Sequence, residues 1–461
     1  MTSDITTLIK HLRCPALTSD DDIAPYLTDA SQAASGRPLA VFLPRTTADV
    51  SAILRLASAH QLPVSVRGAG AGLAGGAAAY DGGLVISTEA MTELSIDAAG
   101  RLADVQPGVL TATLDAAAQA QGLFFAPDPA SATTSTVGGN IATNAGGLRC
   151  LAHGVTADSV AALEVVLASG EVIQTGARTI KNVAGLNLTP LFVGSEGTLG
   201  VITRATVRLK PLPEGTPYTF AASYDSLEDA GAAVLALTKS GLHLESLELI
   251  DRTIVQLINK HHGAGLTAPG AGLLMGLCTG TSAQTDATRA VSMCAEQGAS
   301  STETAEGLSL MEARRLVFSS IYPEGFTVLG DAGVPVPQLP HFIRRIQEIS
   351  EATSRPVLIT AHAGDGNLHP SVYAGAQGEE TESAEAVLAQ ISAVALELGG
   401  TVTGEHGIGS AKLHALEEQL SPATLAAGRA IKAALDPAGI LTRGEASKEH
   451  PSHQSDQILP R

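Results

Sequence analysis

Two histidines flank a short turn in the last third of the chain, and their spacing suits a shared metal ion. The segment reads His362-Ala-Gly-Asp-Gly-Asn-Leu-His369 and follows the strand-like stretch Pro356–Thr360. Gly-Asp-Gly-Asn is strong turn material, so we expect a four-residue hairpin loop at 364–367 that places 362 opposite 369. Directly opposed side chains have Cβ atoms about 4.5–5.5 Å apart, close enough for two imidazoles to bind one divalent ion. A lone histidine is more often structural, but this pair favours a metal site.

A carboxylate and an imidazole stand side by side in a second glycine-framed turn, Thr401-Val-Thr-Gly-Glu405-His406-Gly-Ile-Gly409. Glu405 is predicted to complete a His/His/Glu ligand set, which leaves a coordination position open for substrate. His406 is then the candidate general base, because the unperturbed pKa of an imidazole lies near working pH. The alternative is a solvated turn with a capping glutamate, before a helix expected from about Ser410.

A glycine-rich loop near the N-terminus, Arg67-Gly-Ala-Gly-Ala-Gly-Leu-Ala-Gly-Gly76, contains a literal GxGxxG match. A dinucleotide-binding unit would need a full helix next and an acidic residue about 20 residues further on. Here Asp81-Gly-Gly83 interrupts the chain and a strand is expected at Leu84–Ser87, which argues against a nicotinamide-binding Rossmann unit. Successive small residues still allow backbone N–H groups to form a concave nest for phosphate oxygens. A plain glycine-rich turn is the alternative.

Two further segments are rich in small residues. Pro127–Gly147 is followed by Leu148, and residues 129–148 carry no charge. A backbone of this kind can lie flat against a large planar ligand while offering amides and hydroxyls. Leu191–Ile202 adds another tight turn before a strand.

In their order and spacing, the three segments resemble the vanillyl-alcohol oxidase/p-cresol methylhydroxylase family of FAD-binding proteins. The resemblance implies that the first loop holds the pyrophosphate, the second segment lies along the flavin and ribityl chain, and the adenine packs near Val201. Some relatives attach FAD through His or Cys in the first loop; this loop has neither, so we expect non-covalent FAD. The cofactor-binding residues implied are Arg67, Gly68, Ala69, Gly70, Ala71, Gly72, Ser131, Thr136, Gly138, Gly139, Asn140, Asn144, Gly146 and Val201.

The two histidine motifs make the chain similar to the D-lactate and D-2-hydroxyglutarate dehydrogenase branch of that family. The branch implies that His362, His369 and Glu405 bind zinc or a similar ion and that His406 takes the substrate hydroxyl proton. It also implies that Arg314, in Met311-Glu-Ala-Arg314, holds the substrate carboxylate. A helix-surface arginine is the alternative for that position.

Some positions depart from the branch pattern. Met311 replaces a tryptophan, Leu329 stands where hydroxyglutarate enzymes carry a lysine, and Ser371 stands where the branch has asparagine. Leu186-Asn187 and Thr442-Arg443-Gly444 depart as well. Since the distal end of the substrate site, Ser371 included, is less cationic, we expect a broad D-2-hydroxy-acid profile in which hydroxyglutarate is not strongly preferred.

Composition excludes several classes of protein. The 461 residues carry 28 Lys plus Arg against 46 Asp plus Glu, and a net charge of −18 argues against nucleic-acid and anionic-membrane binding. The N-terminus lacks a signal-peptide layout, and the charge-free stretch 263–285 contains Pro269 and repeated glycine, so no transmembrane segment is expected. We expect a cytoplasmic protein with reduced thiols at its four cysteines, Cys14, Cys150, Cys278 and Cys294.

The predicted fold class is α+β. It combines a two-subdomain FAD-binding domain of the p-cresol methylhydroxylase type with an α+β cap, or substrate, domain built on an antiparallel sheet. Pro211 and Pro213 mark a boundary. The expected divisions are an N-terminal segment at 1–36, the FAD-binding domain at 37–213, the cap domain with the metal site at 214–425, and a C-terminal segment at 426–461 that returns to the FAD domain and ends in a polar tail.

Three functions stay open at this point. The favoured one is an FAD- and metal-dependent dehydrogenase that oxidises D-2-hydroxy acids to 2-oxo acids and passes electrons to an electron-transfer flavoprotein, a cytochrome, a quinone or oxygen. The second is an oxidase or dehydrogenase for another alcohol, with a structural metal. The third is a metal-dependent hydrolase or a catalytically inactive flavin-binding module. The sequence leaves open the preferred acid, the native metal and the oligomeric state, a homodimer included.

Overall fold

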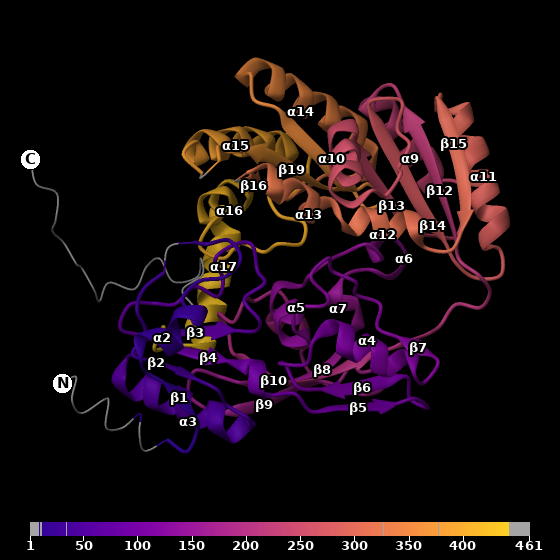
Figure 1. The fold of residues 1–461 in the computed structure, drawn as a ribbon. Helices are drawn as coiled ribbons and strands as arrows, with labels where there is room; N and C mark the ends of the chain where they lie inside the picture. The colour runs from indigo at the N-terminus through magenta and orange to yellow at the C-terminus, as the bar shows by residue number, and fades with distance from the viewer. Residues whose placement is uncertain (1–8, 10–11, 34, 326, 377, 442–461) are drawn as a thin grey trace, which may run out of the picture.

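The computed structural model describes residues 9, 12–33, 35–325, 327–376 and 378–441, so Thr442-Arg443-Gly444 and the predicted polar tail lie outside the described residues. The first half of the chain forms the lower part of Figure 1, and a large sheet with its helices forms the upper part. Helices and predominantly antiparallel sheets are combined in the fold, so the predicted α+β class is confirmed.

The first sheet is small and has the strand order β1-β2-β4-β3. Three of its strands run parallel and β1 runs antiparallel to β2. Helix α3 (Thr47–His60) begins at a capping box between Thr46 and Asp49 and buries Ile53 and Leu54 in the core shared with the sheet. The strands are β1 (Ala16–Leu17), β2 (Ala40–Phe42), β3 (Val64–Arg67) and β4 (Leu84–Ser87).

The second sheet is antiparallel and has the order β5-β6-β10-β8-β9. Leu114 of helix α4 (Thr111–Gln119) and Ile141 of helix α5 (Val137–Thr143) join its core. Helix α5 belongs to the second glycine-rich segment, so this packing holds that segment in place against the sheet. The strands are β5 (Leu94–Asp97), β6 (Leu102–Val105), β8 (Val160–Val166), β9 (Val172–Gly176) and β10 (Val201–Arg208).

The third sheet carries the histidine hairpin. It has the order β15-β12-β14-β13-β18-β19-β16, with β17 paired to β19, and its pairings are antiparallel. The charge-free stretch 263–285 contains strand β14. No described helix is long and apolar enough to cross a membrane. The strands are β12 (Tyr218–Tyr224), β13 (Leu244–Asp251), β14 (Gly272–Cys278), β15 (Ser301–Glu306), β16 (Thr327–Leu329), β17 (Ala332–Gly333), β18 (Val357–His362) and β19 (Asn367–Tyr373).

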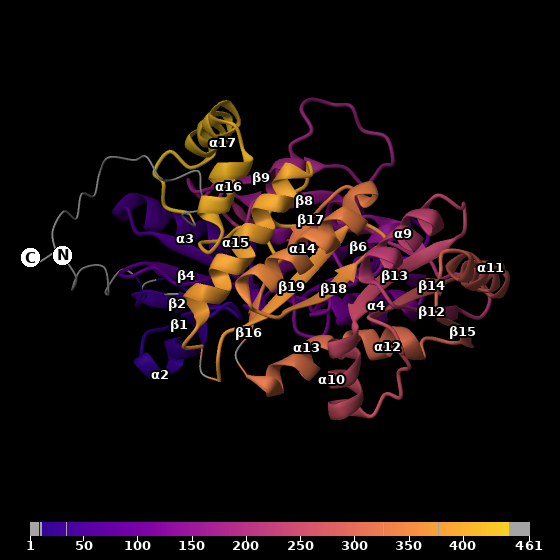
Figure 2. The same ribbon diagram turned by 90° about the horizontal axis from the view of Figure 1, so that it is seen from above.

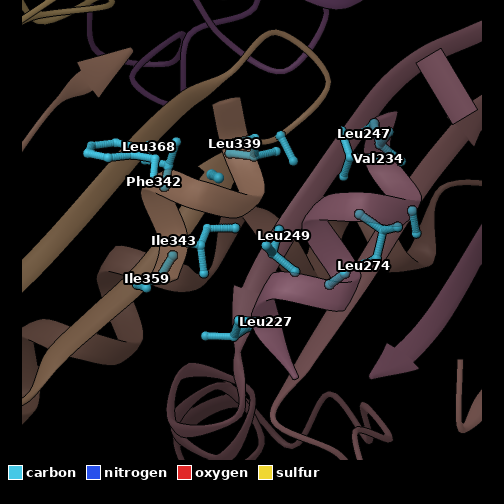
Figure 3. Packing of buried hydrophobic residues seen from close by; sticks show 14 of the residues in the cluster. Leu227, Val234, Leu247, Leu249, Leu274, Leu339, Phe342, Ile343, Ile359 and Leu368 are labelled. Atoms are coloured by element: carbon cyan, nitrogen blue, oxygen red, sulfur yellow. The ribbon is translucent and has the colours of Figure 1, made fainter. Parts of the chain in front are cut away.

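Helices cover both faces of this sheet. Figure 3 shows side chains of α9 (Leu227–Thr238) and α14 (Leu339–Thr353) packed against strand residues such as Leu249 and Ile359. Helices α11 (Ala283–Glu296) and α15 (Thr381–Glu397) belong to the same core. The opposite face packs on α10 (Arg252–His262), α12 (Ser309–Arg315) and α13 (Val317–Ile321), and the last two lie toward the lower part of the molecule (Figure 1).

The chain finally runs back to the first sheet. Helices α16 (Leu413–Gln419) and α17 (Pro422–Leu435) lead away from the large sheet (Figures 1 and 2). Leu441 then forms a parallel bridge with Val64 of β3. The buried Lys432 Nζ donates to the carbonyl of Thr198 and to the Asp436 carboxylate, each at 2.6 Å, and so ties α17 to the residues that precede β10.

Candidate active site

A cavity of about 660 Å³ brings the three glycine-rich segments together with residues of the large sheet's domain. From the latter it receives Arg315, Phe318, Tyr322, Glu405 and His406. The predicted FAD-binding residues that line it are Arg67, Gly68, Ala69, Gly70, Ala71, Gly72, Ser131, Thr136, Gly138, Gly139, Asn140 and Gly146.

Two predicted FAD-binding residues do not line this cavity. Asn144 ends α5 in the left-handed conformation, with φ of 53°, and its Oδ1 accepts a hydrogen bond from the Ala157 N–H at 2.8 Å. Val201 is fully buried in the core beneath the first sheet, because neighbouring strand residues point to opposite faces. Its two neighbours, Gly200 and Ile202, line the cavity, so the expectation that the adenine packs near Val201 stays a prediction.

Two glycines of the cavity wall are required by close contacts within the protein. Gly70 has φ of 72°, and a Cβ there would overlap the Arg67 guanidinium; a Cβ at Gly138 would overlap Pro107. The Arg67 guanidinium donates to the carbonyls of Thr28 at 2.5 Å and Pro25 at 3.2 Å, so it anchors the loop. A backbone held this way presents small residues over a long surface, which fits the FAD molecule that the sequence implies.

The histidine hairpin differs from the predicted register. His362 pairs with Asn367 and His369 pairs with Thr360, so the expected pairing of 362 with 369 is wrong. The turn closes one residue earlier because Gly366 takes the left-handed conformation, with φ of 81°, and Asn367 joins the strand. Since Thr360 and His362 are two residues apart, the two imidazoles still share one face of the sheet, and their ring centroids are 5.2 Å apart.

Glu405 lies between the two histidines. Its Oε1 is 3.4 Å from the His362 Nε2 and 3.1 Å from the His369 Nε2. Two ligand atoms at about 2.1 Å from a tetrahedral ion lie about 3.4 Å apart, so these three atoms fit one divalent ion. The donor set matches zinc chemistry, which takes imidazole nitrogen and carboxylate oxygen.

Two buried carboxylates behind the histidines were not singled out from the sequence. Glu248 of β13 faces the His362 Nδ1, and Asp331, between β16 and β17, lies 3.7 Å from the His369 Nδ1 and 4.0 Å from the His406 Nδ1. The sequence gives no separate signal for Glu248, because its strand Leu244–Asp251 also contains Glu245, Ser246 and Asp251. For Asp331 the signal is an acidic residue two positions after a short strand that ends at Leu329.

Charges in this cluster shift the pKa values of its members. Burial acts to lower the pKa of His362, but Glu248 and Glu405 outweigh it and hold that pKa well above its usual value. Burial acts to raise the pKa of Glu405, but His362 and His369 outweigh it and hold that pKa well below its usual value. Burial lowers the pKa of His406 to about 4, against the opposing effect of Asp331. His406 is therefore neutral near pH 7 and able to accept a proton.

Arg314 is buried beside the ligand set. Its Nε lies 3.0 Å from the Glu248 Oε2, and its Nε and Nη2 form no hydrogen bond with any described residue. It does not line the 660 Å³ cavity, whereas Arg315 does, with an Nη2 2.5 Å from the Asp128 Oδ2. The next turns of the same helical segment contribute Phe318 and Tyr322 to the wall.

Ser371 is buried in β19, two residues after His369 and therefore on the same face of the sheet. Leu329 of β16 pairs directly with it. Leu329 and Ser371 are therefore neighbours, but neither lines the 660 Å³ cavity, and their place at the distal end of a substrate site stays a prediction.

Glu196 connects the third glycine-rich segment to the His406 turn. Its carboxylate accepts hydrogen bonds from the N–H groups of Ile408 at 2.8 Å and Gly409 at 2.7 Å, and it lines the cavity. A second cavity of about 470 Å³ also reaches Glu405 and His362. The candidate ligand set therefore lies where two cavities and both parts of the molecule meet.

The geometry and the comparisons with known proteins identify a class of flavoprotein. Residues 216–446 match the family described as FAD linked oxidases, C-terminal domain, and residues 38–176 match a family described as FAD binding domain. The chain belongs to the FAD-linked oxidase family, and it is an FAD-linked oxidoreductase.

Its relatives include named dehydrogenases and oxidases. The glycolate oxidase subunit GlcD of Bacillus subtilis is 39% identical over 429 residues, covering 91% of each chain. The D-lactate dehydrogenase of Archaeoglobus fulgidus is 40% identical over 409 residues, covering 88% of this chain and 90% of that one. The crystal structure of p-cresol methylhydroxylase with substrate bound has a TM-score of 0.81 at 17% identity and 96% coverage of both chains, which shows the shared fold.

Proposed function

We propose that the protein is an FAD- and divalent-metal-dependent dehydrogenase that oxidises D-2-hydroxy acids to 2-oxo acids. The observation that carries the proposal is the position of Glu405 and His406. Both line the cavity formed by the glycine-rich segments, and Glu405 lies within 3.4 Å of the Nε2 atoms of two histidines. A candidate proton acceptor and one candidate metal ligand thus line the space that the predicted FAD segments enclose.

Each residue has a defined task in this reaction. FAD, when bound, supplies the acceptor for the Cα hydrogen and its electron pair. A divalent ion, for which zinc is the expected metal, supplies Lewis-acid chemistry that lowers the pKa of the substrate hydroxyl. His362, His369 and Glu405 hold that ion. His406 accepts the hydroxyl proton at Nε2, so the substrate loses one proton and one hydride and becomes a 2-oxo acid.

Arg314 is proposed to hold the substrate carboxylate, because its Nε pairs with Glu248 while its buried Nη2 has no hydrogen bond among the described residues. Ser371 is proposed to border the substrate side chain. Phe318 lies edge-on to His369, with ring centroids 6.4 Å apart, and helps exclude water from the reacting atoms.

The names of two relatives support this substrate class. Glycolate and D-lactate are both 2-hydroxy acids, and the relatives named for them cover about nine-tenths of the chain. A small D-2-hydroxy acid, an electron-transfer flavoprotein, cytochrome or quinone as acceptor, and a cytoplasmic location are parts of the same proposal.

Anaerobic reduction of the flavin tests the proposal. The purified protein is mixed with D-lactate, L-lactate, glycolate, D-2-hydroxyglutarate and a simple primary alcohol, and the flavin absorbance is followed. We expect bleaching by D-2-hydroxy acids or glycolate and a slower or no response to L-lactate. Bleaching by the alcohol alone would favour the alternative enzyme with a structural metal, and no bleaching by any of the five compounds would favour the hydrolase or an inactive flavin-binding module. Dialysis against a chelator should abolish bleaching while FAD stays bound.

A further inference from the structure

Asp331 is the most completely enclosed acidic group of the site. Its side chain has 0% exposure, and it stands between β16 and β17, where the chain passes under the Glu405-His406 turn. A carboxylate is costly to bury unless other groups compensate its charge. The groups that surround the Asp331 carboxylate therefore indicate its role.

One oxygen of this carboxylate organises the whole turn. Oδ2 accepts hydrogen bonds from the Thr403 hydroxyl at 2.7 Å and from the consecutive N–H groups of Gly404 at 3.0 Å, Glu405 at 3.1 Å and His406 at 2.9 Å. Three successive N–H groups that converge on one anion form a nest. Asp331 thereby sets the backbone from which Glu405 and His406 project.

The two carboxylate oxygens also lie next to two imidazole rings. His369 and His406 are stacked, with ring centroids 4.9 Å apart and 7° between their planes. The His369 Nδ1 lies 3.7 Å from Oδ1, and the His406 Nδ1 lies 4.0 Å from Oδ2. Both Nε2 atoms point to the Glu405 Oε1, at 3.1 Å and 3.9 Å. Asp331 Oδ1 and His369 Nδ1 are two buried atoms without hydrogen bonds in the described structure, and each is the other's partner in this ion pair.

Asp331, His369 and His406 also satisfy the spacing of a metal site, but their surroundings argue against a cation there. Oδ2 already accepts four hydrogen bonds from the turn. The Lys412 Nζ lies 3.7 Å from it and donates to the carbonyls of Val402 and Asp331. N–H donors and an ammonium group are the surroundings of a permanent anion.

We propose that Asp331 is a positioning residue that fixes the tautomer of both stacked histidines. A carboxylate can only accept hydrogen bonds, so it favours a proton on the imidazole nitrogen that faces it. With Nδ1 protonated in both rings, the Nε2 lone pair of His369 is available to a metal ion and that of His406 to the substrate hydroxyl. One buried residue would then prepare a metal ligand and the general base together. The inference rests on the proposed function and adds a residue to it.

Asp331→Asn separates this role from a purely structural one. The amide oxygen of Asn can still accept from the 404–406 turn, while the opposite orientation would direct its NH₂ group at three N–H donors. The NH₂ group therefore takes the place of Oδ1, next to the His369 ring, and because it is a donor it favours an unprotonated Nδ1 and a protonated Nε2 in His369. A protonated Nε2 can neither bind a metal nor accept a proton.

The first measurement is the tautomer itself, by nitrogen-15 NMR of selectively labelled, metal-free protein, with His369→Gln and His406→Gln used for assignment. We expect protonated Nδ1 in both rings of the wild type and, in Asp331→Asn, protonated Nε2 in His369. The second is metal affinity by chelator competition, where we expect a loss of about 10–100-fold at unchanged FAD content. The third is kcat, expected to fall by about 10²–10⁴-fold with a smaller change in KM.

Asp251→Asn is the matched control. Asp251 is another buried carboxylate of the same domain; it accepts the backbone N–H groups of Ile254 and Ile359 and, among the described residues, forms no hydrogen bond or ion pair with the stacked rings. The control variant should leave tautomers and metal affinity unchanged. Protonated Nε2 in either wild-type ring, or wild-type metal affinity in a folded Asp331→Asn, would overturn the proposal. If the variant does not fold, the nitrogen-15 spectrum of the wild type still tests the proposal, because it reports the tautomers of both rings. Absence of metal binding or of hydroxy-acid oxidation in the wild type would overturn the proposed function and not the tautomer assignment.

Discussion

The Nδ1 atom of His362 lies 3.0 Å from both carboxylate oxygens of Glu248, which stands on the neighbouring strand β13. The Glu248 carboxylate also forms an ion pair with the Arg314 Nε at 3.0 Å. Its side chain is 1% exposed. The carboxylate therefore orients a candidate metal ligand and a candidate substrate-binding arginine. Residues of this kind, behind the ligands, raise the basicity of an imidazole and fix its orientation.

Glu248→Gln should weaken metal binding without affecting the flavin. Glutamine keeps the size of the side chain but loses the charge, and we expect metal affinity to fall by about 10–100-fold. Competition with a chromophoric chelator measures the affinity, and flavin absorbance measures FAD content. Glu245→Gln is the control, because Glu245 lies in the same strand, is buried, and pairs with Arg149 at 3.2 Å. Equal metal affinity in the two variants would contradict this prediction.

The sequence predicted the parts of this site that depend on local patterns. The glycine-rich segments, the histidine hairpin and the Glu405-His406 turn are contiguous motifs, and contiguous motifs keep their residues close together whatever the rest of the fold does. Glu248 and Asp331 were missed because they approach the histidines only through strand pairing and through the connection after β16. Such contacts join positions far apart in sequence, and one sequence gives no signal that distinguishes these two acidic residues from others.

The hairpin register shows a second limit of the sequence. The pattern Gly-Asp-Gly-Asn predicts a turn but does not decide which residue takes the left-handed conformation. In the structure Gly366 does so, and Asn367 belongs to β19. The partner of His362 is Asn367 and not His369, a difference of two positions. Because side chains alternate with a period of two, both histidines stay on one face of the sheet. The prediction of a shared face was therefore independent of the register error.

Substitution of the two neighbouring arginines should separate their roles. Arg314→Ala is expected to raise the KM for hydroxy acids by about 10–100-fold, the loss typical of a hydrogen bond to a charged group. Arg315→Ala should change KM less, since Arg315 is more exposed and pairs with Asp128. Steady-state kinetics on variants with matched FAD content decide the question. The opposite ranking would transfer the carboxylate-binding role to Arg315.

FAD should be released completely by acid. No cysteine lines the 660 Å³ cavity, and its single described histidine is His406, which belongs to the other part of the site. Because the first glycine-rich loop contains neither His nor Cys, it lacks the attachment point that some relatives use for a covalent flavin bond. Acid precipitation followed by absorbance of pellet and supernatant measures the outcome. Yellow colour that stays in the pellet would show a covalent link.

Substrate breadth should follow from the pair formed by Leu329 and Ser371. The distal carboxylate of hydroxyglutarate would meet an apolar side chain and a hydroxyl there, and an unpaired charge in a dry site is costly. We expect kcat/KM for D-lactate and D-2-hydroxybutyrate within about 100-fold of that for D-2-hydroxyglutarate, which corresponds to about 2.7 kcal/mol.

Leu329→Lys is the complementary test. A lysine at this position should shift the kcat/KM ratio toward hydroxyglutarate by about 10-fold, the discrimination available from one charged hydrogen bond. A preference of the wild type for hydroxyglutarate above about 100-fold would show that another basic residue serves its distal carboxylate.

Asp251 should make stability fall as the pH rises from about 4 to about 6. It caps α10, and its oxygens accept the Ile254 N–H at 2.9 Å and the Ile359 N–H at 2.6 Å. Burial raises its pKa to about 6, against the lowering effect of these N–H groups. Because the unfolded carboxyl has a pKa of about 3.9, the folded state binds more protons in this window, and stabilisation present below pH 4 is lost as the pH passes through 6.

A shift of about 2 units corresponds to about 3 kcal/mol of unfolding free energy. Asp251→Asn carries no titrating group, so the wild type should lose about 3 kcal/mol relative to the variant over that pH interval. Denaturant unfolding of both proteins at several pH values, each with saturating FAD, measures the difference. Parallel curves for the two proteins would mean that the Asp251 carboxyl titrates in the folded state as it does in the unfolded chain.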